Sequence, residues 1–113
     1  MPAGYQELFL EQGSEFNTSV TLDNADGSPY SLVNCQVKSS MKKSYYSTNS
    51  TTELTVDLNN PSQGIIILSL TYKQTANIAA GRYVYDVAVK DSSNTVSRVL
   101  EGIVNVSPRV TVF

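Results

Sequence analysis

Several residue types that carry chemistry are absent from this 113-residue chain or nearly so. It has no histidine, no tryptophan and a single cysteine. Histidine is the commonest general base and metal ligand, so its absence removes the usual centre of acid–base and metal chemistry. One cysteine cannot form an intrachain disulfide. We therefore expect no enzyme, with no catalytic, cofactor-binding or metal-binding residues and no cofactor.

Charge is also scarce. Charged residues make up 16% of the chain and the net charge is -2. The basic residues are dispersed, and Lys42 and Lys43 are the one adjacent pair. Nucleic-acid binding depends on clustered basic side chains that neutralise phosphates. We therefore expect no nucleic-acid partner.

No apolar run approaches the roughly 18 to 20 residues that span a bilayer, so we expect no membrane partner. The N-terminus lacks the charged and apolar regions of a secretory signal. We therefore expect synthesis in a cytoplasm without a signal peptide. Cys35 has no histidine or basic neighbour to activate its thiol, and we expect it to be a small buried hydrophobe rather than a reactive group.

The residues that are abundant favour β structure. The chain has 13 valines, 10 threonines and 7 tyrosines, which suit a pleated, half-buried surface. Short alternating runs follow one another at intervals of roughly ten residues, separated by Gly, Pro, Asn and Asp. The length fits one domain. The sequence predicts a single all-β domain over residues 1–113, a sandwich or barrel.

Seven runs are predicted strands, and residues 16–22 show the alternation best: Phe16, Val20 and Leu22 share one face, and polar residues the other. The run at 65–70 is apolar on both faces in its first half, which favours a central strand with a covered outer face and leaves open that a partner covers it. The predicted strands are 5–10, 16–22, 35–41, 54–58, 65–70, 83–90 and 100–106.

Turn residues mark the connections. Residues 23–29 have the Asp, Asn and Gly of a tight reversal, predicted to be a hairpin, and their oxygen density leaves a cation site as an alternative. Residues 91–94 form the clearest hairpin turn. Residues 72–78 alone have helical spacing and predict one short helical turn.

The inward positions of these strands form the predicted core. Its members are Phe16, Val20, Leu22, Cys35, Val37, Leu54, Val56, Ile66, Leu68, Leu70, Tyr83, Tyr85, Val87, Leu100, Val104 and Val106.

Two segments are candidate interfaces. Tyr45 and Tyr46 lie in a polar stretch, either as an aromatic anchor for a partner or sugar or with one ring packed on the domain and one in solvent. The tail carries alternating Val110, Val112 and Phe113 beyond Pro108, and it either adds to a sheet edge or reaches a neighbour.

Five segments carry a resemblance to a known family. They are Gln12–Phe16 (QGSEF), Asp26–Leu32 (DGSPYSL), Gln63–Thr71 (QGIIILSLT), Ala80–Val87 (AGRYVYDV) and Leu100–Val106 (LEGIVNV). Together they resemble the immunoglobulin-like domain at the N-terminus of phage baseplate upper proteins, and small virion proteins of tailed phages, including those of marine cyanobacteria. The similarity covers roughly residues 7–108.

The resemblance implies an immunoglobulin-like antiparallel β-sandwich of about seven to eight strands, with extended termini at 1–6 and 108–113. It implies a non-enzymatic structural protein of a tailed phage virion, in the tail, baseplate, neck or capsid surface, docking on other virion proteins as a homo-oligomer or in many copies. Baseplate upper proteins continue into a long second part, whereas this sequence stops at Phe113. The alternatives are a carbohydrate- or host-receptor-binding module and, less favoured, a small hydrolase.

Overall fold

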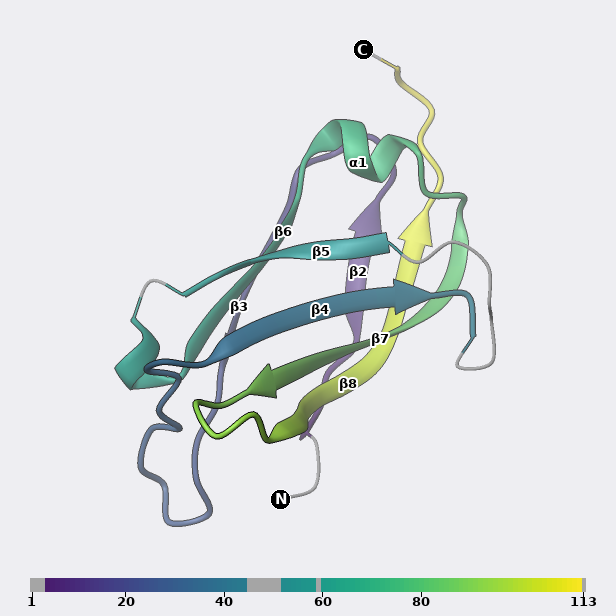
Figure 1. The fold of residues 1–113 in the computed structure, drawn as a ribbon. Coiled ribbons are helices and arrows are strands. Elements are labelled where there is room, and N and C mark those ends of the chain that lie inside the picture. The colour runs from purple at the N-terminus through teal and green to yellow at the C-terminus, as the bar shows by residue number, and fades with distance from the viewer. Residues whose placement is uncertain (1–3, 45–51, 59, 113) are drawn as a thin grey trace.

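The computed structural model describes residues 4–44, 52–58 and 60–112, and within them the chain is almost entirely β. Figure 1 shows the strands curled into a half-barrel with one short helix at an end. The elements are β1 (Gly4–Tyr5), β2 (Leu8–Glu11), β3 (Phe16–Thr21), β4 (Gln36–Lys42), β5 (Thr52–Asp57), the 3₁₀ turn η1 (Pro61–Gln63), β6 (Ile65–Leu70), α1 (Tyr72–Ala76), β7 (Gly81–Lys90) and β8 (Val96–Ser107). The predicted all-β class and the short helix are confirmed.

The strands form two layers that share β5. The hydrogen-bonded order is β1-β8-β7-β4-β5-β6-β3, and β2 also pairs with β8. Residues 52–54 of β5 pair with β4, while residues 55–57 pair with β6. We call β1, β2, β8, β7 and β4 the four-strand layer, because β1 and β2 occupy one position beside β8. The three-strand layer is β3, β6 and β5.

This order is that of an immunoglobulin-like sandwich. In that fold one layer carries strands B, E and D and the other carries C, F and G. Here β3, β6 and β5 take the first set of positions, and β4, β7 and β8 take the second. The predicted immunoglobulin-like sandwich is confirmed. The pairing is antiparallel throughout except at one edge, where β1 and β2 run parallel to β8.

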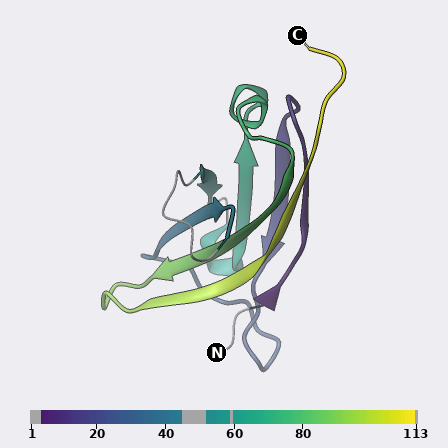
Figure 2. The ribbon, with the colours of Figure 1, turned by 90° about the vertical axis from the view of Figure 1, so that its right-hand side faces the viewer.

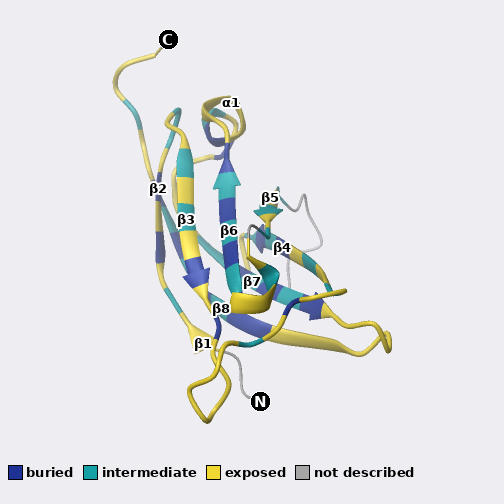
Figure 3. Cartoon of the chain, turned by 90° about the vertical axis from the view of Figure 1, so that its left-hand side faces the viewer, coloured by how far each residue is buried: buried dark blue, intermediate teal, exposed yellow. Residues whose placement is uncertain are grey.

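The three-strand layer follows the period-two pattern closely. β6 lies between β3 and β5, as predicted for a central strand. Its residues alternate between half-buried and buried, and Figure 3 shows this banding along β6, whereas on β3 every second residue is exposed. Leu68 faces Thr18 on one side and Val56 on the other, and it is fully buried. The inner face of this layer is therefore set by simple alternation.

The turn at residues 23–29 forms, but the hairpin predicted there does not extend. The Asn24 N–H donates to the Ser28 carbonyl at 2.8 Å, and Asp23 makes an isolated bridge with Pro29. The Ser28 hydroxyl donates to Asp26 Oδ1 at 2.6 Å, and this bond lowers the pKa of Asp26. Beyond the bridge the chain crosses between layers: β3 pairs with β6, and β4 pairs with β7 and β5.

The predicted hairpin at residues 91–94 is confirmed. The Asp91 N–H donates to the Thr95 carbonyl at 3.0 Å, and Asn94 has a φ of 62°. Figure 2 shows that the hairpin strands β7 and β8 are long and strongly curved. The register shifts between Val87 and Ala88, so Val99 is an extra residue on β8 and is buried beside Leu100. This bulge breaks the alternation expected for 100–106 at its start.

The helix α1 begins with a capping box. The Thr71 side chain accepts from the Gln74 N–H, and the Gln74 side chain accepts from the Thr71 N–H. The buried Thr75 hydroxyl donates to the Ser14 carbonyl at 2.8 Å and accepts from the Gly13 N–H at 3.1 Å. These bonds fix the helix against the turn between β2 and β3.

Eleven of the 16 predicted core residues are buried, and the other five are half-buried against the core. The half-buried five are Phe16, Cys35, Val37, Val56 and Tyr83. Cys35 is a free thiol, less enclosed than expected. The prediction omits the buried residues Leu8, Leu10, Leu32, Met41, Ile78, Val89 and Val99.

Candidate interaction surfaces

The predicted interface residues fall into two groups. Tyr45, Tyr46 and Phe113 lie outside the described residues. Val110 and Val112 follow β8, belong to neither layer and are 98% and 66% exposed. Figure 2 shows this tail extending beyond the end of the sandwich. Its role as an interface stays a prediction.

The base of the tail is held at the α1 end of the domain. The Arg109 N–H donates to Gln12 Oε1 at 3.3 Å, and Gln12 Nε2 donates to the Ile78 carbonyl at 2.9 Å. Gln12 therefore links the start of the tail to the segment after α1. These bonds attach the start of the tail, at Arg109, to the domain.

Within residues 4–44, 52–58 and 60–112, no three or more carboxylate or thiol side chains gather where they could hold a metal ion. In the same residues no helix has the length and apolar character needed to cross a membrane. The sandwich also presents two outer faces, one on each layer.

The outer face of the four-strand layer, here called the four-strand face, has an exposed apolar centre. Phe9 on β2 and Tyr5 on β1 are 70% and 65% exposed. Ile103 on β8 and Val84 on β7 are direct register partners and are half-buried. Because strand residues alternate between faces, all four point away from the core. An exposed apolar cluster on an outer sheet face suits binding to another protein.

Charged side chains surround this centre. Arg98 lies between two acids, with Nε 3.4 Å from Asp86 Oδ2 and Nη1 3.0 Å from Glu101 Oε2. Both ion pairs are exposed enough to be screened by solvent, so they add little to stability. Asn105 Nδ2 donates to Glu7 Oε1 at 2.6 Å, which holds Glu7 on the same face.

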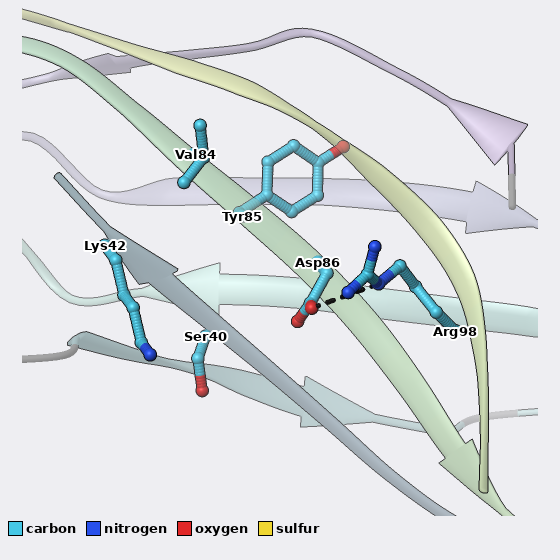
Figure 4. Close-up of a pocket in the computed structure, with 6 residues that line it drawn as sticks. All are labelled: Ser40, Lys42, Val84, Tyr85, Asp86 and Arg98. Atoms are coloured by element: carbon cyan, nitrogen blue, oxygen red, sulfur yellow. Dashed lines mark ion pairs between the residues drawn. The ribbon is translucent and has the colours of Figure 1, made fainter. Parts of the chain in front are cut away.

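A shallow depression of about 170 Å³ lies on the β4 side of this face. Figure 4 shows Lys42 and Ser40 on β4 across from Val84 and Asp86 on β7, with Arg98 of β8 reaching Asp86. Its lining residues are Ser40, Lys42, Val84, Tyr85, Asp86 and Arg98. The depression is too small and open to enclose a ligand of the size that usual binding pockets hold, which favours a contact surface over a small-molecule site.

Beneath the face, a buried hydrogen bond attaches the N-terminal strands. The Tyr85 hydroxyl donates to the Gln6 carbonyl at 2.6 Å, where the chain bends between β1 and β2. Gly102 permits this approach, since a Cβ there would overlap the Gln6 carbonyl oxygen. Burial, with a smaller effect of Tyr5, raises the pKa of Tyr85 to about 12. The phenol is therefore protonated at neutral pH and available as a donor.

A second tyrosine fixes the connection into β7. The Tyr83 hydroxyl donates to the Ala79 carbonyl, four residues earlier, at 2.6 Å. A tyrosine at the start of strand F that bonds to the backbone just upstream is a hallmark of immunoglobulin-like domains. The bond closes the corner between the two layers and supports the fold assignment independently of strand order.

The outer face of the three-strand layer, the three-strand face, is more polar. Asn17, Ser69 and Thr55 form one cross-strand row, and Ser19, Ile67 and Asp57 form the next. Ile67 is half-buried between its neighbours. This face therefore lacks the large exposed side chains of the four-strand face among the residues described.

No protein-family model matches this sequence, and no curated protein matches it. Solved structures do match. An internalin-like protein of Listeria monocytogenes is 17% identical with a TM-score of 0.52, over 93% of this chain and 28% of that one. The SrpA adhesin of Streptococcus sanguinis is 11% identical with a TM-score of 0.52, over 90% and 55% of the two chains. This chain thus spans less than two thirds of either protein, and the similarity shows the fold.

Sequence reasoning missed the four-strand face. The signal was present at Val84 and Ile103, which are apolar at positions that the alternation assigns to the solvent side. Phe9 was hidden because it lies between Leu8 and Leu10, in a run that reads as apolar on both faces. Such residues are informative only once the strand's neighbours are known.

Proposed function

We propose that this protein is a non-enzymatic structural component of a tailed phage virion, docking on other virion proteins through its four-strand face. The observation that supports this most is the exposed centre of Phe9, Tyr5, Val84 and Ile103 on an otherwise closed sandwich. Interface centres are enriched in aromatic and aliphatic side chains with a polar rim, and this face has both. The resemblance in Sequence analysis supplies the virion setting.

The fold fits a repeated building block. Each copy presents the same surface, so a modest contact is multiplied by the symmetry of a particle. The proposal covers four alternative positions in the virion: the tail, the baseplate, the neck and the capsid surface.

The test is the copy number of the protein in purified particles of the phage that encodes it. We expect many copies by quantitative mass spectrometry and a repeated density of this shape by cryo-EM. Particles carrying Phe9→Ser should incorporate less protein, whereas the matched change Ile67→Ser on the three-strand face should incorporate as wild type. Absence from wild-type particles would contradict the virion role. Normal incorporation of Phe9→Ser would contradict only the assignment of the four-strand face as the docking surface.

A carbohydrate- or host-receptor-binding module is the second candidate. It is favoured by the exposed Tyr5 and Phe9 rings beside the Glu7 carboxylate and Asn105 amide, because aromatic faces stack on sugars while such polar groups bond to hydroxyls. Binding on a glycan array, lost in Tyr5→Ala and Phe9→Ala variants or in a Tyr45→Ala, Tyr46→Ala variant, would favour it. No binding to any glycan or host cell would exclude it.

A further inference from the structure

Charge is distributed unequally across the four-strand face. The outward acids at the β2 and β8 side are Glu7, Glu11 and Glu101, and the outward bases at the β7 and β4 side are Lys38, Lys42, Arg82 and Lys90. Three residues depart from this division: Asp86 and Arg98, which pair with each other, and Glu53 on β5, an exposed acid that is the register partner of Ser40 on β4. The face therefore runs from acidic to basic across its strands, with the apolar centre between.

One cross-strand row shows the pattern at single-residue level. Ile103 is the register partner of Val84, and Val84 is the register partner of Lys42. Glu7 lies beyond β8 on the same face, with its carboxylate bonded to Asn105 of that strand. The order across the sheet is acid, aliphatic, aliphatic, base. When a second copy presents the same row in the opposite order, each acid faces a base and each aliphatic side chain faces an aliphatic one.

We infer that the four-strand face binds the same face of a second copy of this chain, related by a two-fold axis parallel to the strands between β8 and β7. Such an axis exchanges the β2 side with the β4 side and keeps each row in place. Ile103 then meets Val84 of the second copy, and Glu7 meets Lys42 of the second copy. Both contacts occur twice. The inference specifies the partner of the face in the proposed function, but it concerns the purified protein and can be tested without particles.

The like charges in the next row are partly offset within each chain. The axis brings Glu101 near Asp86 of the second copy, but each acid is already paired with Arg98 in its own chain. Two Arg98 guanidinium groups therefore lie among four carboxylates at the centre of that row. Phe9 flanks the row on the acidic side and adds exposed apolar area to the contact.

The size of the face predicts a weak dimer. Four strands about 4.8 Å apart and six residues rising about 3.3 Å each give a footprint on the order of 400 Å² per copy. The total of about 800 Å² is below the roughly 1,200 Å² at which stable specific interfaces begin, and it fits a weak, transient contact. We therefore expect a dissociation constant in the micromolar range or weaker. The measurement needs protein samples from about 5 to 500 μM.

The experiment is sedimentation velocity and equilibrium on the full chain over that range, with charge-reversal variants. Glu7→Lys and Lys42→Glu should each weaken homodimerisation by about tenfold or more, because each places two like-charge contacts in the dimer. Mixed together, these two variants should form a heterodimer with both contacts attractive, and the double variant should regain homodimerisation. Phe9→Ser should also weaken it. Asp57→Lys, on the opposite face, is the matched control and should leave it unchanged.

Three outcomes would overturn the inference. The first is a protein that stays monomeric to 500 μM, and the second is a mixture of Glu7→Lys and Lys42→Glu that shows no preferential heterodimer. The third is association that depends on Val110 and Val112 but not on Phe9, which would assign it to the tail. None of these bears on whether particles contain the protein, so this result and the particle test can fail independently.

Discussion

The three-strand and four-strand layers both bury an apolar inner face, but they differ in what else they carry. The three-strand layer relies on alternation, with hydroxyl and amide groups on most of its outer face. The four-strand layer has a buried bond from Tyr85 to Gln6, a second from the Ser39 hydroxyl to the Asp86 carbonyl at 2.8 Å, and aromatic and aliphatic groups outside. Departures from simple patterning therefore concentrate in the layer with the candidate surface.

This difference shows how the two layers can be separated by mutation. Apolar truncation should affect the three-strand layer through lost packing alone. In the four-strand layer, changes near Gly102 and Tyr85 should act on the attachment of β1 and β2, and changes on the outer face should act on binding without affecting stability.

Leu68→Ala should have the largest effect, because Leu68 is fully buried at the centre of the three-strand layer. We expect a loss of about 2 to 5 kcal/mol in the free energy of unfolding, measured by urea denaturation. Val104→Ala, at an equally buried site on β8, removes fewer carbon atoms and should cost less. An unchanged melting temperature for Leu68→Ala would mean that this face does not form the core.

Gly102→Ala should destabilise the four-strand layer at the β1–β2 bend. Its Cβ would overlap the Gln6 carbonyl oxygen and lie 3.1 Å from Tyr85 Cε1, so the N-terminal strands must shift. Overpacking of this kind costs about 1 to 3 kcal/mol. Gly4→Ala is the control, since its nearest contacts are ordinary at 3.6 and 3.7 Å. Equal stability of the two variants in urea would refute the close approach at Gly102.

Tyr85→Phe should leave the Gln6 carbonyl without its buried donor, at a cost of about 1 to 3 kcal/mol. Tyr83→Phe removes a more exposed bond to Ala79 and should cost less, about 0.5 to 1.5 kcal/mol. Hydrogen exchange should locate the loss for Tyr85→Phe in β1 and β2. Uniform exchange changes across both layers would argue against a local attachment.

Tyr85 also predicts a pH dependence. Its pKa is raised to about 12 from the usual 10.0, so the folded state holds the phenol proton more tightly than the unfolded state does. The stabilisation is complete below pH 10 and is lost as the pH rises through 12. The free energy of unfolding of wild type should therefore fall more steeply between pH 10 and 12 than that of Tyr85→Phe. Parallel curves for the two proteins would contradict the assignment of this pH dependence to Tyr85.

The smallest stability effects are expected on the outer faces. Phe9→Ser changes a side chain that is 70% exposed and should alter the free energy of unfolding by about 0.5 kcal/mol or less. Ile67→Ser on the three-strand face, half-buried, should cost somewhat more. For dimer formation the order of the two variants is the opposite, because only Phe9→Ser should weaken binding. A melting temperature lowered more by Phe9→Ser than by Ile67→Ser would contradict this division.

The sequence predicted the three-strand layer well because its signals are local. The alternation at β3 and β6 and the turn residues around them each act within about ten positions of the chain. The sequence did not indicate that β1 and β2 pair in parallel with β8, because the partner lies more than 90 residues away. Leu8 and Leu10 were left out of the predicted core for that reason.

The bulge at Val99 and the crossing after Pro29 were missed for related causes. A bulge shifts the inward set by one residue without any change in composition, so Val99 and Leu100 are buried together. Leu32 is buried in an irregular segment with no alternation to reveal it. Of the predicted interface residues, Val110 and Val112 are exposed, and the apolar centre of the four-strand face was found only from the fold.

The parallel pairing of β1 and β2 with β8 has a mechanical consequence. In Figure 1 the start of β2 and the end of β8 lie toward opposite ends of the sandwich. Tension applied between them pulls β2 and β8 past each other along their length, rather than peeling them apart. All of the hydrogen bonds between the strands then bear the load together, whereas a hairpin pulled at its open end breaks them one after another. A domain built in this way transmits force along its long axis and yields only when the whole ladder shears.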